Sequence, residues 1–215
     1  MNTSTKIFFA TIAIAVFIAR LIPDPERTSH GFGDLFHATH DPLAAQMRIL
    51  PGADEYHFTV VETQGEHCHG DFDSNPCAPP YHYHTIQEET FEVKKGAIKF
   101  RLNDEMITLR KGDKPITVER GQHHTFIKEG NDDLEVEITL RPNPGRNGQR
   151  FFPNLFGTLR DKPSLPQVLY IFCVNGVRLA DIPYVIHEFM CYTTRAVAPL
   201  LGYRHEYPEY AWKEE

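Results

Sequence analysis

Apolar and polar residues alternate through the middle of the chain. The alternation is clearest over residues 134–140 (LEVEITL), where every second residue is apolar. Successive side chains of a β-strand point to opposite faces, so this segment is predicted to be a strand with one buried face. Segments rich in β-branched and aromatic residues predict further strands at 55–63, 90–93, 97–102, 106–109 and 116–118.

Turn-forming residues separate these strands. A loop rich in Gly, Asp, Asn and Pro occupies residues 65–80, and shorter turns are predicted at Gly96, at Asn103 with Asp104, and at Gly112. Many short antiparallel strands at this spacing predict a mainly β fold, either a sandwich or a small barrel.

The pattern changes after residues 141–150 (RPNPGRNGQR), which are predicted to be a linker. Between Leu165 and Gly202 apolar residues recur at helical intervals, which predicts two or three helices. A segment of about 50 residues does not readily bury a core of its own, so these helices are expected to pack on the β domain. The apolar residues expected at that contact are Leu169, Phe172, Ile186 and Phe189.

The first residues differ from the rest of the chain. Thirteen uncharged residues, 7–19, lie between Lys6 and Arg20, and Pro23 and Pro25 follow. A bilayer crossing needs about 20 apolar residues, whereas a run of this length also suits a secretory signal peptide. An uncleaved anchor with a helix over 7–22 is favoured over a cleaved signal, which predicts a membrane of the secretory system, or secretion after cleavage.

The length of 215 residues fits one domain with appendages. The predicted division is a signal anchor or signal peptide at 1–25, a lead-in segment at 26–54, a β domain at 55–142, and a linker with a helical extension at 143–215.

Charge narrows the choice of partners. The formal net charge is −7 and no basic run exists, which disfavours nucleic-acid binding because that binding depends on Lys and Arg facing phosphates. A small, neutral or weakly charged molecule is the more natural partner. Exposed strand edges are also compatible with a homodimer.

Four cysteines are too few for a disulfide scaffold. Cys68 and Cys77 flank the 65–80 loop and are candidates for a bridge if the chain reaches the secretory lumen. Cys173 and Cys191 lie among apolar residues and are expected to be buried thiols.

The histidines suggest a metal site. His82 and His84 are two residues apart in a predicted strand, so both imidazoles leave one face while Tyr83 leaves the other. Glu89 lies five residues after His84, which would place it on the opposite face of an uninterrupted strand. A bend at 86–88 is therefore needed to direct its carboxylate toward the two imidazoles. A fourth ligand is expected from a separate strand at 121–126, which contains His123 and His124.

These residues resemble a known motif. The run H-x-H-x4-E-x6-G, filled by His82, His84, Glu89 and Gly96, resembles the first motif of the cupin superfamily, type 2. A second segment, which begins at Gly112 and ends with Gly121-x-x-His124, is similar to the second cupin motif. It departs from that motif in two ways: Glu119 replaces the customary proline, and Asn131 lies beyond the customary position of the closing asparagine. The resemblance covers about residues 55–142.

The resemblance implies a double-stranded β-helix, the cupin jelly roll, with one divalent ion held inside it. The implied ligands are His82, His84, Glu89 and His124. Three imidazoles with one carboxylate suit several metals; Fe(II) is the first choice, and Mn, Ni, Cu or Zn are alternatives. Gly121 selects His124 rather than His123.

The C-terminal residues 200–204 and 207–210 also resemble the tails of fungal cupin-domain oxidoreductases of polyketide biosynthetic clusters. This resemblance implies a metal-dependent oxidoreductase of secondary metabolism that acts on a small aromatic or polyketide-type metabolite. Two alternatives stay open: an isomerase, dehydratase or cyclase that uses the ion as a Lewis acid, and a non-catalytic small-molecule-binding cupin. No catalytic side chain is identified.

Two further groups have less specific roles. The cluster His67, His69, Asp71 and Asp73 is predicted to be the solvated rim of a loop. The apolar residues expected to form core, or in part the lining of a substrate pocket, are Phe58, Val60, Ile98, Phe100, Phe126 and Val136.

Overall fold

The computed structural model describes residues 27, 36–37, 45–50, 52, 54–143, 147–161 and 164–210. The predicted anchor or signal segment at 1–25, including the helix over 7–22, lies outside these residues.

The predicted membrane localisation is corrected by the structure. In the described ranges, no helix combines the length and the apolar composition that crossing a bilayer demands. The longest helix in these ranges, α2 at Asn147–Asp161, has 15 residues. A helix that crosses the hydrocarbon core of a bilayer needs about 20 residues.

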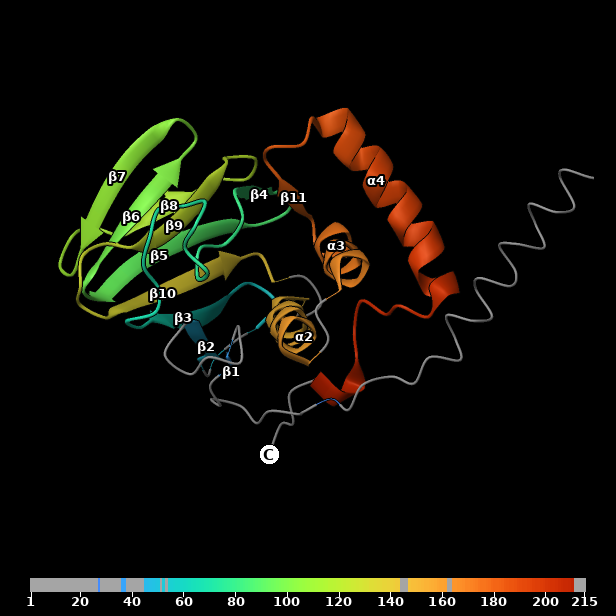
Figure 1. Ribbon diagram of the computed structural model, residues 1–215, viewed down its shortest axis with the longest axis horizontal. Coiled ribbons are helices and arrows are strands. Elements are labelled where there is room, and N and C mark those ends of the chain that lie inside the picture. Colours follow the sequence, from blue (N-terminus) through green and yellow to red (C-terminus); the bar gives the residue numbers. More distant parts are fainter. Residues whose placement is uncertain are drawn as a thin grey trace, which may run out of the picture.

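Two antiparallel sheets form the body of the protein (Figure 1). The first has the strand order β1 (Phe36–His37), β2 (Ala45–Ile49), β3 (Phe58–Gln64), β10 (Leu134–Arg141), β5 (Glu88–Lys95) and β8 (Ile116–Val118). The second has the order β11 (Val177–Leu179), β4 (His82–His84), β9 (His124–Lys128), β6 (Ala97–Leu102) and β7 (Glu105–Arg110).

The sheets pack face to face around an aromatic core. Phe91 of β5 lies 4.9 Å from Phe100 of β6 and 5.5 Å from Phe126 of β9, measured between ring centroids. The predicted core residues Phe58, Val60, Ile98, Phe100, Phe126 and Val136 are all buried there. This arrangement confirms the double-stranded β-helix.

Gly96 joins the two sheets between β5 and β6. Its φ of +73° lies in the left-handed region, and a Cβ there would come within 2.5 Å of the carbonyl oxygen of Asp133. Only glycine fits both conditions without strain. The motif glycine therefore has a structural reason, which is the sharp turn from one sheet to the other.

Helices cover one side of the sandwich. They are α2, α3 (Leu165–Val174), α4 (Tyr184–Val197) and the short 3-10 helices η2 (Ala198–Leu201) and η3 (Pro208–Tyr210). In Figure 1, α2 and α3 lie next to the sheets and α4 lies outermost. The predicted helices between 165 and 202 are confirmed, with β11 inserted between α3 and α4.

The α2 helix was not predicted: residues 141–150 were expected to be a linker, but α2 begins at Asn147, and Pro153 and Gly157 lie inside it. It nevertheless packs on the β core: Phe152 lies 5.9 Å from Phe58 of β3, and Ile171 and Phe172 of α3 join the same cluster. The helices therefore contact the sandwich through α2 and α3. The division of the chain at residue 142 remains a prediction.

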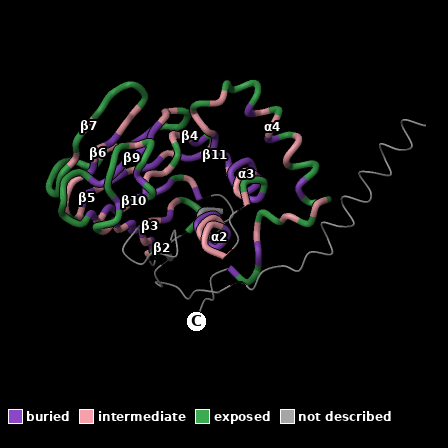
Figure 2. Tube along the Cα trace, viewed as in Figure 1, coloured by how far each residue is buried: buried purple, intermediate pink, exposed green. Residues whose placement is uncertain are grey.

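The α4 helix packs differently from the expectation. Ile186 and Phe189 are 53% and 68% exposed, so the prediction that they face the β domain was wrong. The inward face of α4 is instead formed by His187 and Cys191. Figure 2 shows the same asymmetry, with α4 largely exposed and α2 and α3 largely buried.

Two disulfides are present among the described residues. Cys68 and Cys77 are bridged, as the sequence allowed. Cys173 of α3 and Cys191 of α4 are also bridged, with their Cα atoms 5.1 Å apart, which corrects the prediction of free thiols. The physical reason is the short β11 segment, which returns the chain so that α4 lies beside α3.

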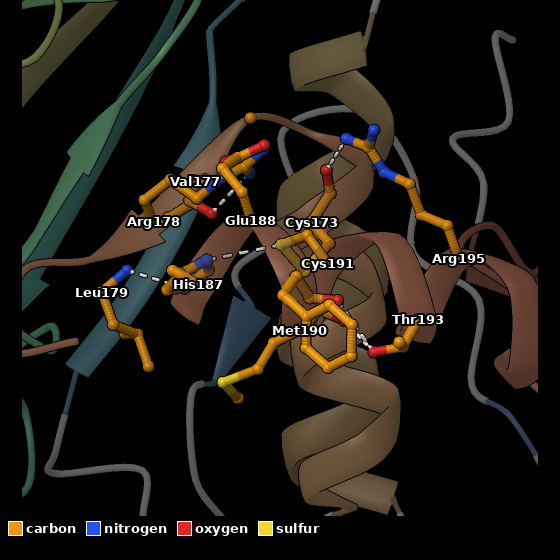
Figure 3. Close-up of a disulfide and its surroundings, with 12 residues drawn as sticks. Cys173, Val177, Arg178, Leu179, His187, Glu188, Met190, Cys191, Thr193 and Arg195 are labelled. Atoms are coloured by element: carbon orange, nitrogen blue, oxygen red, sulfur yellow. Dashed lines mark hydrogen bonds and ion pairs between the residues drawn. A yellow bond between two sulfur atoms is a disulfide. The ribbon is translucent and has the colours of Figure 1, made fainter. Parts of the chain in front are cut away.

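Polar contacts surround this second disulfide (Figure 3). The Nδ1 atom of His187 lies 3.4 Å from the sulfur of Cys191, and its Nε2 accepts a hydrogen bond from the backbone N–H of Leu179. Glu188 pairs with Arg178 at 2.5 Å. The attachment of α4 thus depends on one covalent bond and a few polar contacts rather than on apolar packing.

We expect removal of this disulfide to release α4. In a Cys173→Ala/Cys191→Ala variant, the free energy of unfolding should fall by on the order of 3 kcal/mol, as for a bridge that closes a loop of this size. Amide hydrogen exchange should accelerate in α4 but not in β10. The matched control is Cys68→Ala/Cys77→Ala, which should leave exchange in α4 unchanged. Equal protection of α4 in both variants would contradict the interpretation.

Candidate metal centre

The four predicted ligand residues meet inside the sandwich. His82 and His84 come from β4, His124 from β9, and Glu89 from β5 of the opposite sheet. One ligand atom from each lies within 4.8 Å of all the others, so the cluster could hold one metal ion.

Strand register explains how the imidazoles converge. His82 pairs directly with His124 across β4 and β9, and their ring centroids lie 4.3 Å apart. Tyr83 and His123 point to the other face, where their rings lie 4.9 Å apart. The structure therefore brings His124, and not His123, to the cluster.

Glu89 reaches the cluster because the chain changes sheet. Residues 85–87 lead from β4 to β5, and Glu89 then faces inward on the same side of β5 as Phe91. The bend that the odd spacing required is present. It is the crossing between the two sheets.

The inward atoms are very close to one another. The Nε2 atoms of His82 and His84 are 3.2 Å apart. The Nε2 of His124 lies 2.6 Å from Oε2 of Glu89, and that of His84 lies 3.5 Å from the same oxygen. When deprotonated, all of these atoms are hydrogen-bond acceptors, so a proton or a cation must lie between them.

The outward nitrogens of two rings have backbone partners. Nδ1 of His82 lies 2.7 Å from the carbonyl oxygen of Pro80, and Nδ1 of His124 lies 3.3 Å from that of Gln122. A carbonyl at Nδ1 favours the tautomer that leaves the Nε2 lone pair free, as in histidines that bind metals. The donor set therefore fits a divalent ion such as Fe, Mn, Ni, Cu or Zn.

Burial sets the charge of the cluster. Burial lowers the pKa of His84, and lowers that of His82 well below its usual range, which keeps both rings neutral near pH 7. Burial opposes ionisation of Glu89, yet His84 and the hydrogen bond with His124 together hold the pKa of Glu89 below its usual range. Neutral imidazoles and an ionised carboxylate are the forms that bind metal.

The cluster opens into an apolar cavity of about 610 Å³ between the sheets and the helices α2 and α3. Its aromatic lining consists of Phe91, Phe126, Phe151, Phe152, Phe156 and Phe172. Leu165, which is 79% exposed, and the loop at 76–80 also line the cavity and mark where it reaches the surface. The size and lining suit a small apolar molecule.

Glu62 also lines this cavity, and the sequence analysis missed it. On β3, Glu62 points to the same face as Phe58 and Val60, so a carboxylate lies on the core face of the strand. This alternate spacing was the feature of the sequence from which its burial could have been predicted. Burial, opposed by a hydrogen bond from Gln64 and reinforced by the charge of Glu89, raises the pKa of Glu62 to about 7.

The second polar cluster lies on the surface of the loop, as predicted from the sequence. His67, His69, Asp71 and Asp73 are all exposed. Oδ1 of Asp71 accepts hydrogen bonds from the backbone N–H groups of Asp73 and Ser74, so it stabilises a turn. These residues form the rim of the loop.

The raised pKa of Glu62 predicts a pH-dependent stability. Since the folded protein binds this proton more tightly than the unfolded chain, stability should fall as pH rises from about 4.5 to about 7. Glu62→Gln should remove this loss, which amounts to up to about 3 kcal/mol. Urea unfolding at about pH 5 and about pH 8 measures it. The control Glu135→Gln, on the outer face of β10, should follow the wild type, and equal slopes in all three proteins would refute the assignment.

Comparison with known proteins places the site in context. Residues 71–140, which contain all four cluster residues, match the model of the Cupin domain. No curated protein matches the chain.

Several solved structures are similar at low identity. KdgF from a Halomonas species is 18% identical, with a TM-score of 0.40 over 54% of this chain and 94% of that one. The nucleoside dehydratase Pac13 of Streptomyces is 17% identical, with a TM-score of 0.38 over 56% and 83%. The cupin domain of Schizosaccharomyces pombe Cnp3 is 13% identical, with a TM-score of 0.39 over 54% and 73%.

Identities and TM-scores this low carry no argument about function. The sheet topology and the His and Glu cluster stand independently of them. Together with the match of residues 71–140 to the Cupin domain, they support placing this β domain in the cupin superfamily.

Proposed function

We propose that this protein is a metal-dependent oxidoreductase that acts on a small aromatic or polyketide-type metabolite in secondary metabolism. The observation that carries the proposal is the position of the cluster. Three imidazoles and one carboxylate lie at the wall of a cavity whose lining is otherwise almost entirely apolar and aromatic.

The donor set supports the metal assignment. His82, His84, Glu89 and His124 would hold one divalent ion, with Fe(II) as the first choice. Four protein ligands leave coordination positions open, and an ion bound there supplies redox or Lewis-acid chemistry.

The chain itself contributes orientation and exclusion of water. The carbonyl oxygens of Pro80 and Gln122 fix two of the imidazole rings. The aromatic walls would hold a flat ring system by offset or edge-to-face contacts. The helical extension at 143–215 supplies part of these walls through α2 and α3, so the cupin domain at 55–142 and the extension would act as one unit.

The resemblance of the C-terminal tail to fungal polyketide-cluster oxidoreductases supports the same substrate class. The Lewis-acid enzyme and the non-catalytic binding cupin are the competing functions. All three functions use the same metal and cavity. An oxidoreductase would consume O₂ as it converts the bound molecule, a Lewis-acid enzyme would convert the molecule without O₂, and a binding protein would release it unchanged.

Anaerobic purification followed by metal analysis and O₂-uptake assays tests the proposal. We expect one equivalent of iron per chain and O₂ consumption with hydroxylated aromatic aldehydes or alcohols. Conversion without O₂ uptake would favour the Lewis-acid enzyme, and binding without conversion would favour a binding protein.

The ligand assignment has a test of its own in neighbouring histidines. His124→Gln should lower metal affinity by well over tenfold, since even the loss of a residue that only supports a ligand costs about 10- to 100-fold. His123→Gln should keep the metal content of the wild type, because its ring lies against Tyr83 on the outer face. Metal per chain, measured after identical reconstitution, decides between them. Loss of metal from His123→Gln alone would contradict the proposed ligand set.

A further inference from the structure

The cavity holds one ionisable side chain that the metal cluster does not use. Among the described lining residues, Glu62 is the only titratable group besides His82, His84, Glu89 and His124, because Cys77 is bound in a disulfide. A carboxyl group in an aromatic cavity is costly to bury without a compensating partner. Its presence therefore needs an explanation.

The sheet presents Glu62 to the cavity among apolar neighbours. Its cross-strand partners are Met47 on β2 and Val136 on β10. Both are buried, and neither has a side chain that can donate a hydrogen bond to a carboxylate. No lysine or arginine is among the described residues that line the cavity, so Glu62 has no ion-pair partner there.

Gln64 holds one end of the carboxyl group. Its Nε2 donates to Oε1 of Glu62 at 2.8 Å, and its Oε1 accepts the backbone N–H of Lys128 at 3.0 Å. The second contact fixes the amide so that its NH₂ group faces Glu62. The other oxygen, Oε2, forms no hydrogen bond with any residue that the structure describes, and is available to a molecule in the cavity.

We propose that Glu62 is a catalytic residue that binds a hydroxyl group of the aromatic substrate and takes up its proton. This inference rests on the proposed function and names one recognition element of the same cavity. The substrate O–H bond breaks, the proton moves to Oε2, and the electron pair stays on the substrate oxygen as a phenolate. The reverse transfer returns the proton to the product.

The protonation equilibrium suits this role. The pKa of Glu62 is raised to about 7, chiefly by burial, so both protonation states are populated near neutral pH. The charge of Glu89 acts in the same direction as burial. Of the cluster histidines that line the same cavity, His82 and His84 stay neutral near pH 7 because burial lowers the pKa of each.

Binding of two matched probes tests the inference without turnover. 2-Naphthol carries an ionisable hydroxyl, and 2-methylnaphthalene has the same ring system without one. On zinc-loaded wild type, we expect 2-naphthol to bind about tenfold more tightly, which corresponds to one charge-assisted hydrogen bond. This preference should grow about fivefold as Glu62 ionises and becomes a stronger acceptor, between about pH 6 and about pH 8 in the metal-free protein and at lower pH with zinc bound.

Variants distinguish an effect of Glu62 from a loss of metal and from the loss of any other carboxylate. Glu62→Leu should reduce the preference to about twofold or less, and Glu62→Gln should abolish its pH dependence, while both keep one zinc per chain. Glu135→Gln, on the outer face, should behave as wild type. An unchanged preference in Glu62→Leu, or an unchanged pH dependence in Glu62→Gln, overturns the inference.

Measurements of O₂ consumption and kcat test the oxidoreductase proposal separately from the role of Glu62. If the hydroxyl preference depends on Glu62 but no O₂ is consumed, the oxidoreductase proposal fails and the recognition element stands. If O₂ is consumed and Glu62→Gln keeps the wild-type kcat, the oxidoreductase proposal stands and the catalytic role of Glu62 fails.

Discussion

The structure depends on the convergence of acceptor atoms inside an apolar core. The ligand atoms of Glu89 and three imidazoles lie within 4.8 Å of one another, and among the described lining residues no lysine or arginine balances the carboxylate. Burying an anion without a partner costs several kcal/mol. A cation at the centre of the cluster removes this cost and satisfies all four acceptors at once. A divalent cation held there would therefore stabilise the folded core as well as supply chemistry.

The C-terminal extension supports this cluster more directly than its place in the sequence suggests. The strand β4, which carries His82 and His84, has only three residues, and β11 of the extension pairs with it. Val177 lies opposite His84 and Leu179 opposite His82. Without β11, β4 would be an exposed edge held only by β9. The same extension provides Phe151, Phe152 and Phe172 to the cavity, so it both holds the ligand strand and closes the space beside it.

Local signals were sufficient for much of this architecture. The strands at 97–102 and 116–118 were predicted with their observed bounds, because alternation and turn residues are properties of neighbouring residues. The cluster of His82, His84, Glu89 and His124 was predicted because motif spacing encodes strand parity and the change of sheet. The signal that Glu89 needed a bend came from its odd spacing alone.

Features that depend on distant contacts were not predicted. The bridge between Cys173 and Cys191 requires α3 and α4 to lie side by side, which no local pattern reveals. The α2 helix forms in spite of Pro153 and Gly157 because its phenylalanines pack on the β core. Glu62 was not identified, because the strand at 55–63 was predicted from its β-branched and aromatic residues. Its importance follows from the cavity, which is built by elements far apart in the chain.

The two carboxyl groups of the cavity show how position assigns chemistry to one residue type. Glu89 contacts imidazoles and stays ionised, whereas Glu62 faces methionine, valine and aromatic rings and keeps its proton to about pH 7. Environments that separate the pKa values of paired acids are typical of acid–base sites. The negative charge of Glu89 also contributes to the raised pKa of Glu62. A cation bound by Glu89 cancels part of that contribution and makes Glu62 a stronger acid, so metal loading and the protonation of Glu62 are thermodynamically linked across one cavity.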